Sequence, residues 1–560
     1  MKKNTLLCIM AVLCLAVLVG CTTPPAPTTE PTTVPTTVPV DPTENWETGF
    51  VAAYVPEVEW FDEGGASLGM IPRGTQVRYG VTPEGRNGIL LEDVLGYLQE
   101  GALVLEEVTD CVLAQTLYVR TAVNLRDAEG NLLEAFAEKG AAVEVTGCDF
   151  VDEKGAAHMY RVSFGDTEGY IMPWYVADSQ EEALKNYDAG SYTTHVNRGD
   201  RYGGGDAAAL DYFPREKAAI AGNEMPEECR TLYLVNWRIK DVDSYISLAE
   251  QSGINAFVVD ITDGEAIGYD SEVMKKYSPS AASAASNTVE EYQTAIKKLK
   301  DAGYYVIGRI TTFNDYYFVK DHPEYAIADL NGTPLRLSAT YWPTPYNRTA
   351  WQFKTDLAVE AVELMGFNEI QFDYVRFPDS TWRYEQSGNI DFRNTYNESK
   401  AQAIQRFLMY AADRLHEKGA YVSADVYGES AYTYVTAYGQ YWPAISNVVD
   451  AISGMPYPDH FAASGDYRPW EHPYDTIHAW GECVALRQKE TATPAAVRTW
   501  IQAYNAIREP YNRYGSAEVA AQIKALRDTG CTGGYMTWNP TSSLDKYYSL
   551  ISAFEPPAES

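Results

Sequence analysis

The sequence predicts an α/β protein, with a (β/α)8 barrel in its C-terminal part and two small all-β barrels before it. From Thr231 onward, apolar segments of strand length alternate with segments of helical periodicity. Several helical segments end in glycine just before the next apolar segment, which is a common boundary in α/β units. Residues 50–178 instead carry short alternating strands around glycine turns, in two copies. The 560 residues leave room for all three units.

Residues 1–21 form a secretion signal rather than part of the fold. Two lysines precede an apolar stretch at 6–19, and the segment 18–21 (LVGC) resembles the lipobox of bacterial lipoproteins. We therefore expect cleavage before Cys21, lipidation of Cys21 and anchoring on the outer face of the cytoplasmic membrane. Residues 22–47, rich in Thr and Pro, are expected to form a disordered linker that reaches into the cell wall.

Residues 48–109 and 110–180 repeat one pattern. The matching segments are Tyr54-Val55 with Tyr118-Val119, Asp62-Glu63-Gly64 with residues 127–130, Pro72-Arg73-Gly74 with Glu138-Lys139-Gly140, and Gly96-Tyr97-Leu98 with Gly169-Tyr170-Ile171. Trp60 and Phe61 would then stand where the second copy has Asn124 and Leu125. The second copy resembles a bacterial SH3 domain, a module associated with cell-wall binding, and the first resembles a degenerate version of it. A passive spacer is the alternative reading.

Residues 230–555 are expected to form the barrel, after a linker at 181–229 that leads into it. The predicted strands are 231–236, 254–260, 304–310, 368–373, 420–425, 448–454, 498–504 and 533–538. The predicted helices are 242–252, 289–302, 349–365, 396–418, 433–446, 474–489 and 516–529. A doubly wound open sheet is the alternative, but no glycine-rich phosphate-binding turn follows any of these strands.

The carboxyl ends of the predicted strands carry acids, arginines, amides and aromatic rings, and in a barrel these ends meet at one mouth. Glycoside hydrolysis needs two carboxyl groups there. We predict Asp373 as nucleophile or base, because the neighbouring Arg376 favours a charged carboxylate. Asp425, at the end of the next strand, is the predicted general acid, with Glu429 as the alternative. Asp260 is expected either to hold sugar hydroxyls or to orient Arg309. The predicted substrate-binding residues are Trp237, Asp260, Arg309, Arg376, Tyr457, Gln502, Trp538 and Asn539.

Composition argues against several other functions. The net charge of −33 argues against binding of nucleic acid or of an anionic membrane surface, and it disfavours strongly anionic wall polymers. The cysteines beyond the signal are widely spaced and the histidines are scattered, so we expect neither a disulfide scaffold nor a metal site. No cofactor-binding motif and no G-x-S-x-G elbow occur. The expected partners are therefore a polysaccharide and, through the lipid anchor only, the membrane.

The barrel segment resembles a glycosyl hydrolase-like domain family of unknown function that occurs in secreted and wall-associated bacterial proteins. The similar segments within 230–545 include GINAFVVDITD, GYYVIGRITTF, NEIQFDYVRFP, YVSADVYG and AISGMPYPDHF. The resemblance implies a TIM barrel among glycosidase-like folds, and it places Asp260, Arg309, Asp373, Arg376, Asp425, Tyr457 and Gln502 on matching motifs. We expect a glycoside hydrolase that acts on a cell-wall or extracellular polysaccharide. A non-catalytic carbohydrate-binding or cell-wall scaffold lipoprotein is the alternative.

Overall fold

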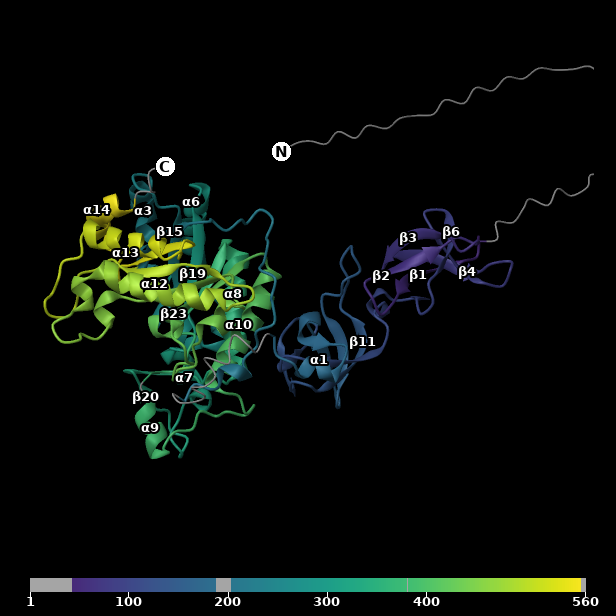
Figure 1. Ribbon diagram of the computed structural model, residues 1–560, viewed down its shortest axis with the longest axis horizontal. Coiled ribbons are helices and arrows are strands. Elements are labelled where there is room, and N and C mark those ends of the chain that lie inside the picture. Colours follow the sequence, from purple (N-terminus) through teal and green to yellow (C-terminus); the bar gives the residue numbers. More distant parts are fainter. Residues whose placement is uncertain (1–42, 188–202, 380, 555–560) are drawn as a thin grey trace, which may run out of the picture.

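The computed structural model describes residues 43–187, 203–379 and 381–554 (Figure 1). The predicted signal, Cys21 and nearly all of the Thr/Pro linker lie outside these residues. Two antiparallel sheets come first, and a parallel barrel surrounded by helices follows. Within these described ranges, no helix is both long and apolar enough to cross a membrane.

The two N-terminal sheets share one topology. The first contains β1 (Glu47–Ala52), β2 (Glu57–Phe61), β3 (Ser67–Pro72), β4 (Gln76–Val81), β5 (Asn87–Leu91), β6 (Val94–Leu98) and β7 (Leu103–Leu105). The second contains β8 (Gln115–Val119), β9 (Val123–Arg126), β10 (Leu132–Ala137), β11 (Ala142–Cys148), β12 (Tyr160–Phe164), β13 (Thr167–Ile171) and β14 (Val176–Ala177). Their strand orders are β3-β2-β6-β5-β4-β1-β7 and β10-β9-β13-β12-β11-β8-β14. Counted from its own first strand, each sheet has the same order, which confirms the internal repeat. The SH3 resemblance stays a prediction.

The structure corrects the alignment of the two copies at β1 and β8. Val51 accepts a backbone hydrogen bond from Gly74 (2.8 Å), and Val119 accepts the equivalent bond from Gly140 (2.6 Å). Val51 therefore corresponds to Val119, and the predicted match of Tyr54-Val55 with Tyr118-Val119 is wrong. The Tyr-Val dipeptide of the first copy lies after its strand, where the two copies differ in loop length.

A second correction concerns β2 and β9. The pairing of β2 with β6 and of β9 with β13 shows that residues 59–61 correspond to residues 124–126. Trp60 thus takes the place of Leu125, and both side chains are buried. The predicted correspondence of Trp60 with Asn124 is wrong by one residue, and a slip of one residue in a strand exchanges its inner and outer faces.

The barrel confirms the predicted parallel architecture. Its strands are β15 (Cys229–Leu234), β16 (Ala256–Asp263), β19 (Tyr305–Thr311), β22 (Glu369–Asp373), β23 (Tyr421–Tyr427), β24 (Ala451–Met455), β25 (Ala496–Val497), β26 (Thr499–Gln502) and β27 (Gly534–Trp538). β25 pairs with β24 while β26 pairs with β27, so the two act as one strand interrupted at Arg498. The first barrel strand of the chain, β15, also pairs with the last, β27, so the paired order runs from β25 round to β26. Each predicted strand overlaps an observed one.

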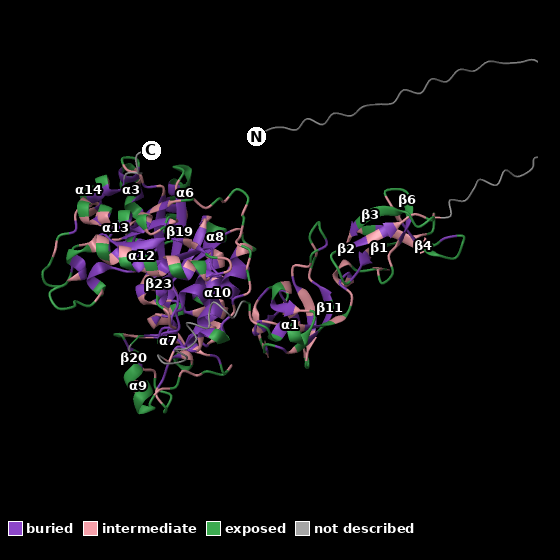
Figure 2. Ribbon diagram, in the orientation of Figure 1, coloured by how far each residue is buried: buried purple, intermediate pink, exposed green. Residues whose placement is uncertain are grey.

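Helices cover the outside of this sheet (Figures 1 and 2). The main ones are α3 (Val242–Ala249), α6 (Val289–Asp301), α8 (Arg348–Met365), α10 (Lys400–His416), α11 (Trp442–Ser446), α12 (Pro473–Lys489) and α13 (Ser516–Asp528). The helix predicted over 433–446 is wrong in its first part. Gly439, with φ of +87°, closes a turn onto Thr436, and the helix begins only at Trp442.

Loops that follow β19 and β22 build an extension at the carboxyl end of the barrel. They contain α7 (Tyr316–Asp321), the hairpin of β20 (Arg336–Leu337) and β21 (Thr340–Tyr341), and α9 (Trp382–Ser387). Figure 1 shows β20 and α9 projecting from the end of the barrel that lies opposite the C-terminus. Because loops after parallel strands lie at their carboxyl ends, this extension borders the mouth.

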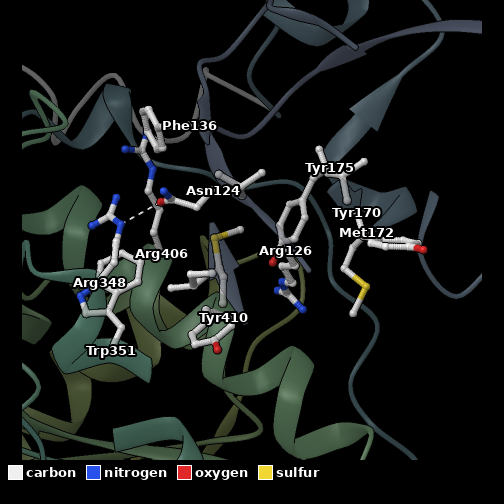
Figure 3. A pocket seen from close by; sticks show the side chains of 14 residues that line it. Asn124, Arg126, Phe136, Tyr170, Met172, Tyr175, Arg348, Trp351, Arg406 and Tyr410 are labelled. Atoms are coloured by element: carbon white, nitrogen blue, oxygen red, sulfur yellow. Dashed lines mark hydrogen bonds between the residues drawn. The ribbon is translucent and has the colours of Figure 1, made fainter. Parts of the chain in front are cut away.

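The second sheet is packed firmly against α10. Asp413, whose side chain is 1% exposed, accepts hydrogen bonds from Arg126 (2.5 Å), Tyr175 (2.7 Å) and Arg215 (2.8 Å). Arg348 of the barrel donates to Asn124 of the sheet at 2.8 Å (Figure 3). The cavity left between them measures only about 20 Å³. This interface therefore holds the second sheet against helices on the outside of the barrel.

Candidate active site

A cavity of about 210 Å³ opens at the carboxyl end of the barrel. Its lining comes from the ends of six strands and the loops after them, so side chains far apart in the sequence meet here, as the barrel predicts. The lining residues are Arg309, Asp373, Tyr374, Arg376, Tyr427, Met455, Tyr457, His460, Trp500 and Trp538.

Asp373 ends β22 and is held in a fixed orientation at the cavity. One carboxylate oxygen accepts from Arg309 Nη2 at 2.5 Å, and the other accepts from the backbone N–H of Tyr374 at 2.5 Å. Tyr374 has a φ of +50°, an uncommon conformation for an aromatic residue, and its carbonyl accepts from the N–H of Phe313 (3.2 Å). Backbone strain of this kind concentrates at functional sites. Asp373 is the one lining residue of the cavity with a carboxylate.

Arg309 joins several acids at the base of the cavity. Its Nη1 donates to Asp260 at 2.6 Å, its Nη2 to Asp373, and its Nε lies 3.7 Å from an oxygen of Asp425. Asp263, which is partly exposed, lies 3.4 Å away. The Arg309 side chain is only 2% exposed, so this charge cluster is shielded from water. One guanidinium therefore balances three or four carboxyl groups, and some of these must be protonated.

Asp425 is one acid whose charged form is disfavoured. It is completely buried, and one oxygen accepts from Trp500 Nε1 at 2.7 Å. Burial and the nearby charge of Asp373 raise the pKa of Asp425 well above its usual range, while Arg309 opposes this rise. Asp425 does not line the cavity, whereas the Trp500 ring to which it bonds does. The predicted general acid thus lies just behind the cavity surface.

Asp260 is the second acid with a perturbed pKa. It is fully buried and accepts hydrogen bonds from Arg309 and from the Tyr233 hydroxyl. Burial raises the pKa of Asp260 to about 7, although Arg309 acts in the opposite direction. Asp260 is not among the residues that line the cavity, so of its two predicted roles its contacts fit the orientation of Arg309 rather than the binding of sugar hydroxyls.

Arg376 does not pair with Asp373, contrary to the prediction. Its Nη1 donates to the carbonyl of Phe377 (3.0 Å) and its Nη2 to the hydroxyl of Tyr427 (2.6 Å). The cation beside Asp373 is Arg309, which arrives from the adjacent strand β19. Arg376 nevertheless lines the cavity.

Four other predicted residues lie away from the cavity lining. Gln502 is buried and bonds to the backbone of Asp459 (3.2 Å) and Tyr504 (3.3 Å), and Asn539 donates to the carbonyl of Ser543 (3.2 Å). Their amides are thus used to fix loops. Trp237 is 49% exposed outside the lining, and Glu429 accepts from the hydroxyls of Tyr434 (2.9 Å) and Tyr438 (2.8 Å). Tyr457 and Trp538 do line the cavity, with their ring centroids 6.4 Å apart.

The lining also includes Tyr374, Tyr427 and Met455, which end or follow the strands predicted at the mouth, and two residues that the sequence interpretation missed, His460 and Trp500. Trp500 could have been found, because it lies two residues before Gln502 on the same strand. Side chains two residues apart point to the same face of a strand, so Trp500 points inward as Gln502 does. His460 follows the Tyr-Pro-Asp turn after β24, and burial lowers its pKa. Nothing in the sequence pattern distinguished it from the other histidines.

The described ranges contain no group of three or more His, Cys, Asp or Glu side chains that could hold a metal ion. The site is therefore described by its acids, its two arginines and its aromatic rings. Fold and site together define the class of the protein: a (β/α) barrel with acids, arginines and aromatic rings around a cavity at the mouth, where barrel enzymes carry their active sites.

The comparison with known families is consistent with this class. Residues 231–544 match the family described as "Putative glycosyl hydrolase domain", and the chain belongs to this family. This confirms the resemblance found in the sequence. No curated protein matches the chain.

Several solved structures are similar to parts of the chain. A hypothetical protein from Ruminiclostridium thermocellum ATCC 27405 is 33% identical, covering 35% of this chain and 97% of that one, with a TM-score of 0.30. The PgaB (BpsB) glycoside hydrolase domain from Bordetella bronchiseptica is 14% identical, covering 60% and 100%, with a TM-score of 0.43. Flavobacterium johnsoniae chitobiase is 12% identical, covering 58% and 48%, with a TM-score of 0.38.

Proposed function

We propose that the protein is a glycoside hydrolase that cleaves a cell-wall or extracellular polysaccharide. The observation that carries this proposal is the placement of Asp373 in an aromatic cavity, where it shares Arg309 with a second acid, Asp425. Membership in a glycosyl hydrolase family supports it. The rings of Tyr457 and Trp538 offer flat apolar surfaces on which sugar rings stack.

The two acids differ in the way that glycoside hydrolysis requires. Asp373 lines the cavity and is held in place by hydrogen bonds from Arg309 and from the N–H of Tyr374, so its carboxyl group is positioned to act as nucleophile or base. Burial raises the pKa of Asp425 well above its usual range, which favours the protonated form that a general acid needs. Its Oδ2 makes no hydrogen bond among the residues described, so a proton there is not committed to a protein acceptor.

A non-catalytic carbohydrate-binding protein is the second candidate. One observation favours it: Asp373 lines the cavity, whereas Asp425 lies behind it. The two candidates differ in whether a bound glycan is cleaved. We would therefore screen the purified chain on a glycan array and assay every bound glycan for release of reducing ends. Release that is lost in Asp373→Asn supports the hydrolase, whereas binding without release across the array supports the second candidate.

Asp425 should control the alkaline side of the pH–rate profile. A general acid must be protonated, so kcat/KM should fall as the pH rises through the raised pKa of Asp425. Asp425→Asn should lower kcat by about 10²- to 10⁴-fold and remove this falling limb. Trp500→Phe removes a hydrogen bond that lowers the pKa of Asp425, so the limb should move to higher pH. A limb that stays in place in both variants would exclude Asp425 as the acid.

We also propose that Cys21 carries the lipid anchor, with the barrel held in the cell wall by the Thr/Pro linker and the N-terminal sheets bound to wall glycan. The LVGC segment after the apolar stretch supports the anchor. Metabolic labelling with a palmitate analogue should mark the wild-type chain, and Cys21→Ala should lose the label. Persistence of the label in that variant would refute the anchor.

A further inference from the structure

Arg376 is a buried guanidinium that faces the mouth cavity without a carboxylate partner. The residue is 4% exposed, and its donors reach only the Phe377 carbonyl and the Tyr427 hydroxyl. In the described part of the chain, no Asp or Glu oxygen lies within 4.0 Å of its nitrogen atoms. Buried charges in proteins are normally paired. Among the described residues, Arg376 thus has no carboxylate partner.

Aromatic rings surround Arg376 instead of acids. Its guanidinium carbon lies 4.4 Å from the ring centroid of Tyr427, 5.1 Å from that of Trp342 and 5.2 Å from that of Tyr374. These rings attract the cation but carry no net charge. Arg309 in the same cavity is the opposite case, because it contacts Asp260, Asp373 and Asp425. Of the two arginines that line the cavity, Arg376 is therefore the one whose charge remains available to a ligand.

A groove at the same end of the barrel also combines an aromatic ring with arginine side chains. The groove has a volume of about 640 Å³ and lies between the β20–β21 hairpin and α9. Its lining residues are Arg336, Leu337, Ser338, Trp382, Arg383, Tyr384, Ser387 and Asn389. Trp382 is 54% exposed, and neither arginine forms an ion pair within the described residues. The groove thus offers a flat ring beside two unpaired cations.

Trp342 stands between the cavity and the groove. Its ring centroid lies 6.0 Å from that of Tyr374, which lines the cavity. Its Nε1 donates to the carbonyl of Leu337, which lines the groove, at 3.1 Å. Trp342 thus contacts one residue of each hollow, which makes the cavity and the groove neighbours at this end of the barrel.

We propose that the substrate is a glycan that bears carboxylate groups, one of which binds Arg376 while the next sugars lie on Trp382 between Arg336 and Arg383. This inference rests on the proposed glycan-binding function. A planar guanidinium matches a carboxylate through two parallel hydrogen bonds. The net charge of −33 does not prevent this contact, because exposed charges are screened beyond about 8 Å at physiological ionic strength.

Matched oligosaccharides test the inference directly. We would measure Kd and KM of the full chain for carboxylated chains and for the same chains after carboxyl reduction to the neutral alcohol. Uronic-acid chains and chains with lactyl ether groups form separate arms, which distinguish the two sources of a carboxylate. The carboxylated form should bind about 10- to 100-fold more tightly, and this preference should shrink as salt is added. Equal Kd values for both forms in both arms would overturn the inference.

Arg376→Gln should remove most of the preference for carboxylated chains. Arg376→Lys should retain part of it, because lysine keeps the positive charge but cannot form two parallel hydrogen bonds to one carboxylate. Lys297→Gln is the matched control, since this lysine is 72% exposed on α6 and its loss should leave the preference unchanged. If Arg376→Gln does not fold, Arg336→Gln combined with Arg383→Gln should still weaken binding of long carboxylated chains several-fold more than that of short ones. An unchanged preference in folded Arg376→Gln, or unchanged long-chain binding in the double variant, contradicts the inference.

The same assay separates this inference from the proposed function. Carboxylate-dependent binding without cleavage supports the acidic glycan and rejects the hydrolase. Cleavage of both forms with equal KM supports the hydrolase and rejects the acidic glycan.

Discussion

Asp373→Asn is expected to lower kcat for glycan cleavage by about 10²- to 10⁴-fold or more while the fold and glycan binding persist. Asparagine has nearly the same shape and still accepts a hydrogen bond from the N–H of Tyr374, but it can neither attack the sugar as a nucleophile nor take a proton from an attacking water. Initial rates at saturating glycan, together with Kd values and circular dichroism, measure this separation of catalysis from binding.

Asp301→Asn is a suitable control, because this acid pairs with Lys297 on the outer surface of α6. It should leave kcat unchanged. Near-normal turnover in Asp373→Asn would reject Asp373 as the reacting carboxylate and would direct attention to Asp263 and Glu429, the partly exposed acids near the mouth.

Arg309→Met is expected to lower the free energy of unfolding by about 3–5 kcal/mol near neutral pH, more than any other substitution proposed for this protein. The substitution leaves Asp260, Asp373 and Asp425 buried together without their shared cation. The loss should become smaller as the pH falls, because protonation removes the uncompensated charge of acids whose pKa is already raised, about 7 for Asp260. Urea unfolding of both proteins between pH 8 and pH 5 would measure the change.

Lys297→Met provides the comparison for that experiment. Its exposed pair with Asp301 should contribute at most about 0.5 kcal/mol, and the effect should vary little with pH in this range. A pH-independent loss in Arg309→Met would mean that Arg309 contributes by packing rather than by charge.

Much of the barrel was predictable because its signals are local. Period-two and period-3.6 patterns place the strands and helices, and a glycine such as Gly366, with φ of +70°, marks where α8 must end. The 433–446 segment failed because Gly439 requires a turn that the apolar pattern does not reveal. Closure of the sheet through the interrupted strand at Arg498 depends on pairing between distant segments, which no local pattern encodes.

The candidate site was less predictable, because depth within a barrel does not follow from position at a strand end. Asp373 ends β22, whereas Asp425, predicted at the end of the next strand, lies two residues before the end of β23, and only Asp373 lines the cavity. Arg376 is near Asp373 in sequence, but the loop carries it away, and Arg309 of the neighbouring strand takes its place. Contacts across strands decide these partners, and sequence distance does not report them.

The shared strand order of the two N-terminal sheets indicates a duplicated ancestor whose copies then diverged in use. The second copy kept polar contacts for the barrel, with Arg126 bound to Asp413 and Asn124 bound to Arg348. The residue of the first copy that corresponds to Arg126 is Phe61, which has no hydrogen-bond donor for Asp413. The second copy is thus bound to the barrel by polar contacts. The first copy does not carry the arginine that makes the contact with Asp413, so its residues at these positions are not constrained by that contact.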